Sequence, residues 1–71
     1  MDVRGPYIKL AQLIKLAGIA GSGAEASALV RDGGVRLNGD VELRRSRKVI
    51  GGDLVEVEGY PATIEVRVDC G

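Results

Sequence analysis

Two stretches in the first half of the chain repeat their apolar residues at the spacing of an α-helix. In the first, the i, i+3, i+4, i+7 positions are Leu10, Leu13, Ile14 and Ala17. Pro6 lies just upstream of this stretch and Gly18 just past its end, as expected for the limits of a helix. The pattern predicts a first helix over residues 8–17, with its polar side chains on the opposite face.

The second stretch begins with the spacing of a capping box, Ser22-x-x-Glu25. Ser22 is expected to accept a hydrogen bond from the Glu25 amide, and the Glu25 carboxylate one from the Ser22 amide. An alanine-rich run follows, and Gly33-Gly34 is suited to close it in a left-handed conformation. The sequence therefore predicts a second helix over residues 24–32, packed closely on the first.

After residue 34 the apolar period changes from 3.6 to 2, which is typical of β-strands. Short strands are predicted around residues 35–37, 41–43, 54–58 and 62–68.

The pair Asn38-Gly39 indicates a tight hairpin between the first two of these strands. A two-residue loop would set Leu37 opposite Asp40 and mix the faces, whereas a three-residue loop, residues 38–40, pairs Leu37 with Val41. Because cross-strand partners share a face of the sheet, we expect the three-residue loop.

The order of the elements predicts an α+β fold, in which two N-terminal helices pack on a small, mainly antiparallel sheet of about four short strands. With 71 residues, of which 45% are hydrophobic, the chain is expected to form one domain, residues 1–71. The longest uncharged stretch is the nine residues 16–24, which is far short of a membrane span. We therefore expect a cytoplasmic monomer with no membrane partner.

The composition argues against most kinds of catalytic and metal site. The chain has no His and a single cysteine, Cys70, so it lacks the residues for a His-dependent nucleophile, a structural zinc site or a disulfide framework. Glu56 and Glu58 alternate with valines and are interpreted as the solvated face of a strand. The glycines at 21 and 23 fit a loose dinucleotide fingerprint, but they follow a helical pattern and are interpreted as a turn. We expect no catalytic residue, metal, cofactor or small-molecule substrate.

The charges are unevenly distributed along the chain, although the net charge is zero. Residues 1–48 carry a net charge of +4 and residues 49–71 a net charge of −4. The densest cations are Arg44, Arg45, Arg47 and Lys48, a segment without alternation that is expected to be an exposed connector. If this connector folds back beside the helices, its cations form one patch with Lys9, Lys15 and Arg36.

Such a patch is suited to phosphate, since Arg binds it in a bidentate manner and Lys supplies a point charge. The amides near residues 21–23, at the start of the second helix, are expected to add an anion site. An acidic protein partner and a merely solvated surface remain as alternatives. The chain has only two aromatic residues, Tyr7 and Tyr60, and therefore a poor platform for unpaired bases. Nucleic-acid binding is thus expected to involve the phosphates and shape of structured RNA.

The order of the elements and several motifs resemble a known family. The two helices are followed by the segment VRLNGDVELRRSRKVIGGDLVEV, residues 35–57. This arrangement resembles the S-four (S4) RNA-binding domain, also called the alpha-L RNA-binding motif, and above all small bacterial proteins that consist of this domain alone. The resemblance covers about residues 7–57. It implies RNA binding through the two-helix face and the adjoining basic hairpin region.

Charge and resemblance together give one set of candidate residues. The residues expected to bind RNA are Lys9, Lys15, Ser22, Arg36, Arg44, Arg45, Arg47 and Lys48. Asn38 and Gly39 also match the family motif and are expected to be structural turn residues. Gly23 and Ser27 occupy positions where many family members have a cation on the second helix. We therefore expect the connector to supply more of the RNA contacts than the helix.

These residues predict a non-enzymatic module that binds structured RNA, ribosomal or transfer RNA. The alternative is an adaptor that binds an acidic protein through the same basic edge, or through the strand at 62–68 as an open sheet edge.

Overall fold

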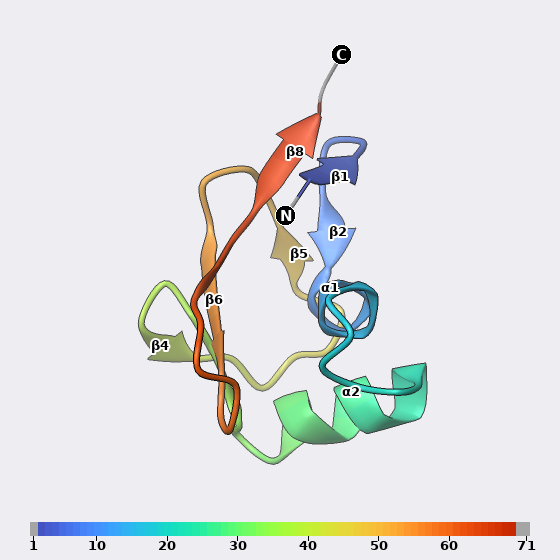
Figure 1. The fold of residues 1–71 in the computed structure, drawn as a ribbon, viewed down its shortest axis with the longest axis vertical. Coiled ribbons are helices and arrows are strands. Elements are labelled where there is room, and N and C mark those ends of the chain that lie inside the picture. The colour runs from blue at the N-terminus through green and yellow to red at the C-terminus, as the bar shows by residue number, and fades with distance from the viewer. Residues whose placement is uncertain (1, 70–71) are drawn as a thin grey trace.

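The computed structural model describes residues 2–69, so Cys70 lies outside the described residues. Along the chain the elements are β1 (Asp2–Arg4), β2 (Ile8–Lys9), α1 (Leu10–Leu16), α2 (Gly23–Arg31), β3 (Val35–Leu37), β4 (Asp40–Val41), β5 (Lys48–Val49), β6 (Leu54–Val57), β7 (Ile64–Glu65) and β8 (Arg67–Asp69). Figure 1 shows their arrangement, with α2 at the lower end of the molecule, α1 above it near the middle, and β8 at the upper end.

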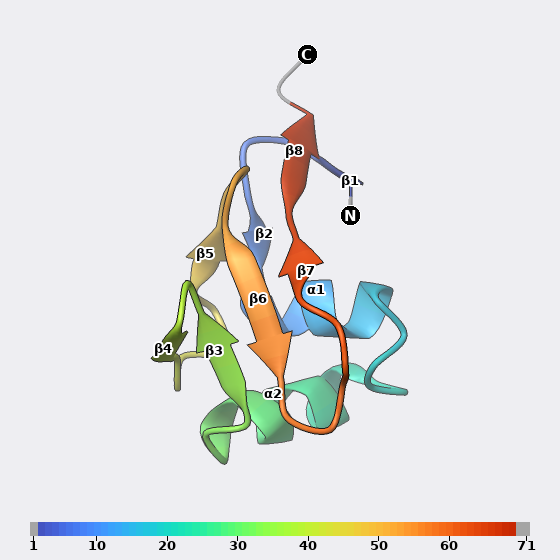
Figure 2. The same ribbon diagram turned by 60° about the vertical axis from the view of Figure 1, so that its left-hand side comes forward.

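The main sheet is antiparallel and has the strand order β4-β3-β6-β7. Both helices lie behind it in Figure 2, with α1 across its middle and α2 at its lower end. Two smaller strand pairs complete the fold: β2 runs antiparallel to β5, and β1 runs parallel to β8. The predicted α+β architecture, two helices on a small antiparallel sheet, is confirmed.

The core lies between the helices and the inner face of the sheet. Leu10, Leu13 and Ile14 of α1 are fully buried, as the helical period predicts. From the sheet, Val55 and Val57 of β6 face the core while the alternate glutamates face solvent. The predicted face assignments of both segments are therefore confirmed.

The ends of α2 form largely as expected. Ser22 Oγ accepts from the Glu25 amide at 3.2 Å, but the Glu25 carboxylate accepts from the Gly21 amide at 2.9 Å, not from that of Ser22. The reciprocal half of the predicted capping box is therefore displaced by one residue. At the other end, Gly33 has φ +81° and the Gly34 amide donates to the Leu29 carbonyl at 3.0 Å. This is the Schellman geometry that closes a helix.

The predicted register of the hairpin was wrong. Leu37 lies opposite Asp40, so the loop has two residues, Asn38 and Gly39, with φ 53° and 87°. Positive φ at both positions is typical of a type I′ turn, whose twist matches that of the flanking strands. The mixing of faces that argued against this register costs little, because β4 is an edge strand whose two residues are both exposed.

Three short strands were not predicted, and one predicted strand is divided. The first helix begins at Leu10, two residues later than expected, because Ile8 pairs with Val49 in the β2–β5 pair. The predicted strand at 62–68 is interrupted at Val66, whose amide donates to the Asp53 carbonyl at 3.0 Å. After this point the chain leaves β6 and runs beside β1 (Figure 2). Segments of two or three residues are too short to show a period in the sequence.

Candidate nucleic-acid interface

The basic connector is fixed along the start of α1 by its own backbone. The Leu10 amide donates to the Arg47 carbonyl at 2.9 Å, and the Ala11 amide donates to the Arg45 carbonyl at 3.1 Å. These carbonyls satisfy first-turn amides of a helix that has no side-chain cap at Lys9. The connector therefore folds back beside the helices, as expected, while its side chains are exposed.

The strand pair β2–β5 brings two further cations together. Lys9 lies opposite Lys48, while Ile8 and Val49 anchor the other face in the core. Like charges directly opposite each other destabilise a strand pair. The Lys48 ammonium lies over the ring of Tyr7, 4.9 Å from its centroid. The β2–β5 pair thus holds the positive charges of Lys9 and Lys48 together at the surface, although their repulsion destabilises the strand pair.

A groove runs between the two helices and the connector. It is lined by Ala11, Gln12, Lys15, Gly23, Ala24, Ser27, Arg31 and Arg45. Each of the three walls supplies one cation: Lys15 from α1, Arg31 from α2 and Arg45 from the connector. The other side chains are small or uncharged, so a phosphodiester backbone has room to approach these cations.

Two smaller hollows continue this groove along the connector. The first, which we call the connector hollow, is lined by Ser27, Arg31, Leu43, Arg44, Arg45 and Ser46. The second is lined by Arg44, Ser46, Arg47 and Lys48. Because adjoining depressions share residues, they form one continuous surface. We define the basic surface by its cations, Lys9, Lys15, Arg31, Arg44, Arg45, Arg47 and Lys48.

The cations of the basic surface are mostly unneutralised. Among the cations of the basic surface, Arg44 pairs with Glu42 at 3.3 Å, and no other has a carboxylate of residues 5–67 within 4.0 Å. Outside this surface, Arg67 lies 4.0 Å from Glu65. Only one cation of the basic surface therefore has a carboxylate partner. An external anion is the natural complement of such a surface.

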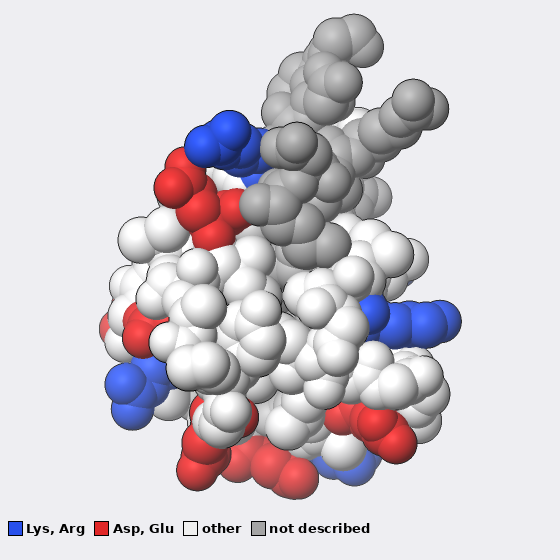
Figure 3. All heavy atoms as spheres, viewed as in Figure 1, with Lys and Arg blue, Asp and Glu red and all other residues white. Residues whose placement is uncertain are grey.

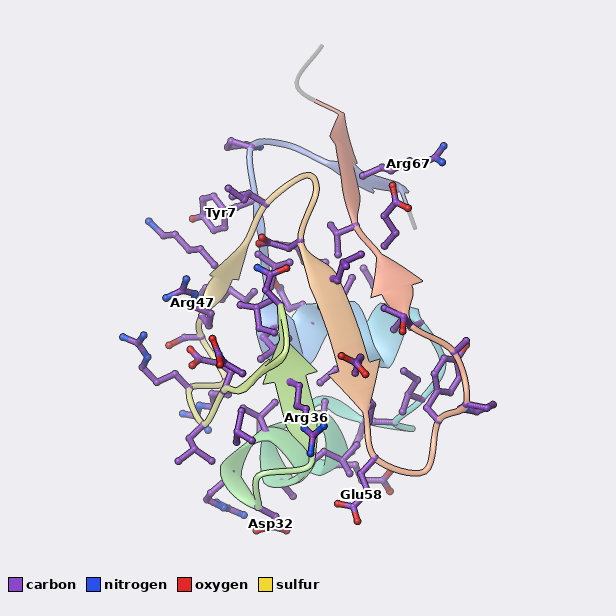
Figure 4. The ribbon with its side chains drawn as sticks, turned by 90° about the vertical axis from the view of Figure 1, so that its left-hand side faces the viewer. Tyr7, Asp32, Arg36, Arg47, Glu58 and Arg67 are labelled. Atoms are coloured by element: carbon purple, nitrogen blue, oxygen red, sulfur yellow. The ribbon has the colours of Figure 1, made fainter. Side chains whose placement is uncertain are left out.

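Arg36 lies apart from the basic surface. It projects from the outer face of β3, opposite Glu56 of β6, and lines a separate hollow together with Glu58. In Figure 4, Arg36 lies near Glu58 over the sheet, whereas Arg47 and Tyr7 lie together at another side of the molecule. The expected patch therefore forms without Arg36, which is surrounded by acidic rather than basic neighbours.

Ser22 and Asn38 have structural partners. The Ser22 hydroxyl caps α2, and the Gly21 amide beside it is occupied by the Glu25 carboxylate. A negative side chain at this helix start argues against the anion site expected there. The Asn38 side chain donates to Asp53 Oδ1 at 3.0 Å and accepts from the amide at the start of β6 at 2.9 Å. It therefore fastens the hairpin turn to β6.

Arg31 was absent from the residues expected to bind RNA. It lies four residues after Ser27, so both side chains lie on one face of α2. That spacing was visible in the sequence, but the contact of this face with the connector was not.

Figure 3 shows that the face seen in Figure 1 has charges of both signs around its rim and an uncharged centre.

None of the helices in residues 2–69 is long and apolar enough to cross a membrane. Nor does this part of the chain contain a cluster of three or more potential metal-ligating side chains.

The sequence model of the S4 domain family matches residues 1–67. The chain belongs to the S4 domain family. The resemblance inferred from its motifs is thereby confirmed, and the helical pair with its antiparallel sheet is the alpha-L fold of that family.

Relatives of this S4 domain carry names that refer to RNA and to the ribosome. A protein of Escherichia coli (strain K12) named "Putative RNA-binding protein YbcJ" is 34% identical over 59 residues, which are 83% of this chain and 84% of that protein. A protein of Bacillus subtilis (strain 168) named "Probable ribosome maturation protein RlbA" is 40% identical over 53 residues, 75% of each chain.

A solved structure extends the comparison to three dimensions. The solution structure of E. coli YbcJ is similar to this S4 domain with a TM-score of 0.67 and 30% identity. The similarity covers 93% of this chain and 85% of that one. The description of that structure attributes to YbcJ an alpha-L motif involved in RNA binding.

Proposed function

We propose that this S4 domain is a non-enzymatic protein that binds structured RNA through the basic surface. The observation that carries the proposal is the continuous row of cations across α1, α2 and the connector, of which only Arg44 has a carboxylate partner. The backbone hydrogen bonds from α1 to the connector hold these cations in place before any ligand binds. Such preorganisation reduces the ordering cost of binding.

The shape of the surface favours paired RNA over a flexible strand. Proteins that bind unpaired RNA stack its bases on aromatic side chains. Here the Tyr7 ring already has the Lys48 ammonium over it, and Tyr60 lies in the turn after β6, outside the residues that line the basic surface. Phosphate contacts along an RNA helix need only the cations that the groove provides.

Ribosomal or transfer RNA is the proposed partner, with ribosomal RNA favoured. The support for this finer assignment is the name of the B. subtilis relative, which refers to ribosome maturation. Both RNA classes are folded into helices and junctions and are abundant in the cytoplasm, where we place this function. A single copy of the chain presents the whole basic surface, so the proposed binding unit is a monomer.

A pair of double variants with equal charge change tests the placement of the interface. Arg31→Ser with Arg45→Ser removes two cations from the groove, whereas Arg36→Ser with Arg67→Ser removes two cations that lie outside it. Each phosphate contact contributes about 0.9 to the slope of log K against log salt on duplex DNA, and we take a similar value for duplex RNA. Titration of a hairpin RNA at several salt concentrations should show a slope lower by about two units for the groove variant only.

The same experiment distinguishes the competing explanations. Equal losses in the two double variants would mean that net charge alone matters and that the groove is not the interface. Absence of RNA binding by the wild type would contradict the proposed function and favour an adaptor for an acidic protein.

A further inference from the structure

The connector hollow differs in chemistry from the rest of the basic surface. Among its lining residues is Leu43, a large apolar side chain that is 59% exposed. A Cβ atom at Gly33 would lie 3.9 Å from Leu43 Cδ2, so this side chain leans over the C-terminal end of α2. Around it stand three arginines and the hydroxyl groups of Ser27 and Ser46. The hollow thus combines an apolar wall, cations and hydroxyls.

These three kinds of group match the three parts of a nucleotide. Arginine binds phosphate oxygens in a bidentate manner. A serine hydroxyl both donates and accepts, and so suits a base edge or a ribose 2′-hydroxyl. An exposed leucine offers an apolar surface to the face of a base. Neither Arg31 nor Arg45 has a carboxylate partner among the described side chains of residues 5–67, so both remain available to a phosphate.

A base within a regular RNA helix does not present its face to a protein. Its faces are stacked on neighbouring bases, and only its edges are accessible in the shallow minor groove. A base that has left the stack exposes both faces and gains from apolar contact. The apolar wall of the connector hollow therefore fits an unpaired nucleotide, while the adjoining groove contacts the backbone of the flanking helix.

We propose that the connector hollow holds one unpaired nucleotide, so that the preferred RNA is a helix interrupted by a bulge. Leu43 is then a residue that determines specificity, and the arginines around it supply affinity for the neighbouring phosphates. The inference rests on the proposed function and makes it more specific, because a uniform helix would leave Leu43 exposed.

Three hairpin RNAs with the same stem test the inference. One is fully paired, one has a single bulged uridine in the middle of the stem, and one has an abasic residue at the position of the bulge. The wild type should bind the bulged hairpin about tenfold more tightly than the paired one, which corresponds to about 1.4 kcal/mol. The abasic RNA keeps the flexible backbone but lacks the base, so it should lose most of this preference.

Two variants with the same type of substitution assign the preference to the hollow. Leu43→Ser should abolish the preference for the bulge and leave the affinity for the paired hairpin within about twofold. Ile50→Ser is the control, since Ile50 is 53% exposed and does not line the hollow. This variant should bind all three RNAs as the wild type does. Both positions are exposed, so thermal melts should show folded protein.

The outcomes separate this inference from the proposed function. Equal affinity of the wild type for the paired and bulged hairpins overturns the bulge inference and leaves RNA binding intact. A preference that persists in Leu43→Ser, or that falls equally in Ile50→Ser, overturns the role of Leu43. If the wild type binds none of the three RNAs, both proposals are wrong.

Discussion

At the scale of single residues, the hairpin turn shows how local chemistry fixes a tertiary contact. Asn38 and Gly39 both have positive φ, a conformation that Asn tolerates and Gly adopts freely. The side chain of Asn38 then bonds to the Asp53 carboxylate and to the Leu54 amide, 16 residues further along the chain. Asp53 in turn accepts from the Ile50 amide at 2.8 Å, so the two turns support each other.

A comparison of Gly39→Val with Arg45→Ala tests this interpretation. Gly39 has φ 87°, which a β-branched residue adopts only with strain of about 1–3 kcal/mol. The side chain of Arg45 is exposed, and its carbonyl still bonds to α1 after truncation, so the loss should be at most about 0.5 kcal/mol. Thermal melts of both variants should show the larger destabilisation for Gly39→Val. Equal melting temperatures would contradict the assigned strain.

At the scale of elements, the connector separates a structural role from a binding role. Its backbone carbonyls accept from the first turn of α1, whereas its side chains are exposed. Of the four connector cations, Arg44 alone has a carboxylate partner, Glu42, so the run repels itself and adds little stability. The sequence of this segment is therefore explained better by a ligand than by the fold.

Replacement of all four connector cations by serine should therefore separate the two roles. The variant with Arg44, Arg45, Arg47 and Lys48 changed to Ser is expected to remain folded, because the backbone bonds persist. It should bind hairpin RNA far more weakly, with a salt slope lower by roughly three units than that of the wild type. Circular dichroism monitors the fold, and titrations across a range of salt concentrations give the slope.

The opposite outcome has a definite meaning. A folded quadruple variant with wild-type affinity and wild-type slope would show that the connector side chains do not touch RNA. The contacts would then have to come from Lys9, Lys15 and Arg31.

At the scale of the whole molecule, the neutral net charge conceals two surfaces of different character. The cations of the basic surface lie along the helices and the connector, whereas Glu56 and Glu58 face solvent on the sheet side, where Arg36 is the basic residue beside them. The acidic sheet repels phosphate and leaves the basic surface as the side on which an RNA approaches.

A whole-molecule prediction follows from the shape and the aromatic content. The protein should bind a hairpin RNA more tightly than a linear RNA of the same length and base composition, because its basic surface is fixed and has no free stacking platform. Titration of the two RNAs at one salt concentration measures the difference. A clear preference for the linear strand would contradict binding through phosphates and shape.

The sequence by itself determined the elements that depend on neighbouring residues. The buried face of α1, the Ser22 cap and the glycine closure of α2 all arise from interactions within about five residues, so periodicity and capping rules suffice to predict them. The exposed cations of the connector were predicted for the same reason, since their lack of alternation is a local property.

Only the tertiary structure decided which distant residues meet. The hairpin register depends on the edge position of β4, and the start of α1 depends on the pairing of Ile8 with Val49, 41 positions apart in the numbering. The basic surface contains Arg31, which the sequence did not predict, because the connector bonds to α1 beside α2. It lacks Arg36, which the sequence did predict, because β3 pairs with β6 and places Arg36 opposite Glu56. Backbone hydrogen bonds between segments far apart in the chain determine these contacts. The local pattern of residue types does not indicate which distant segments form such bonds.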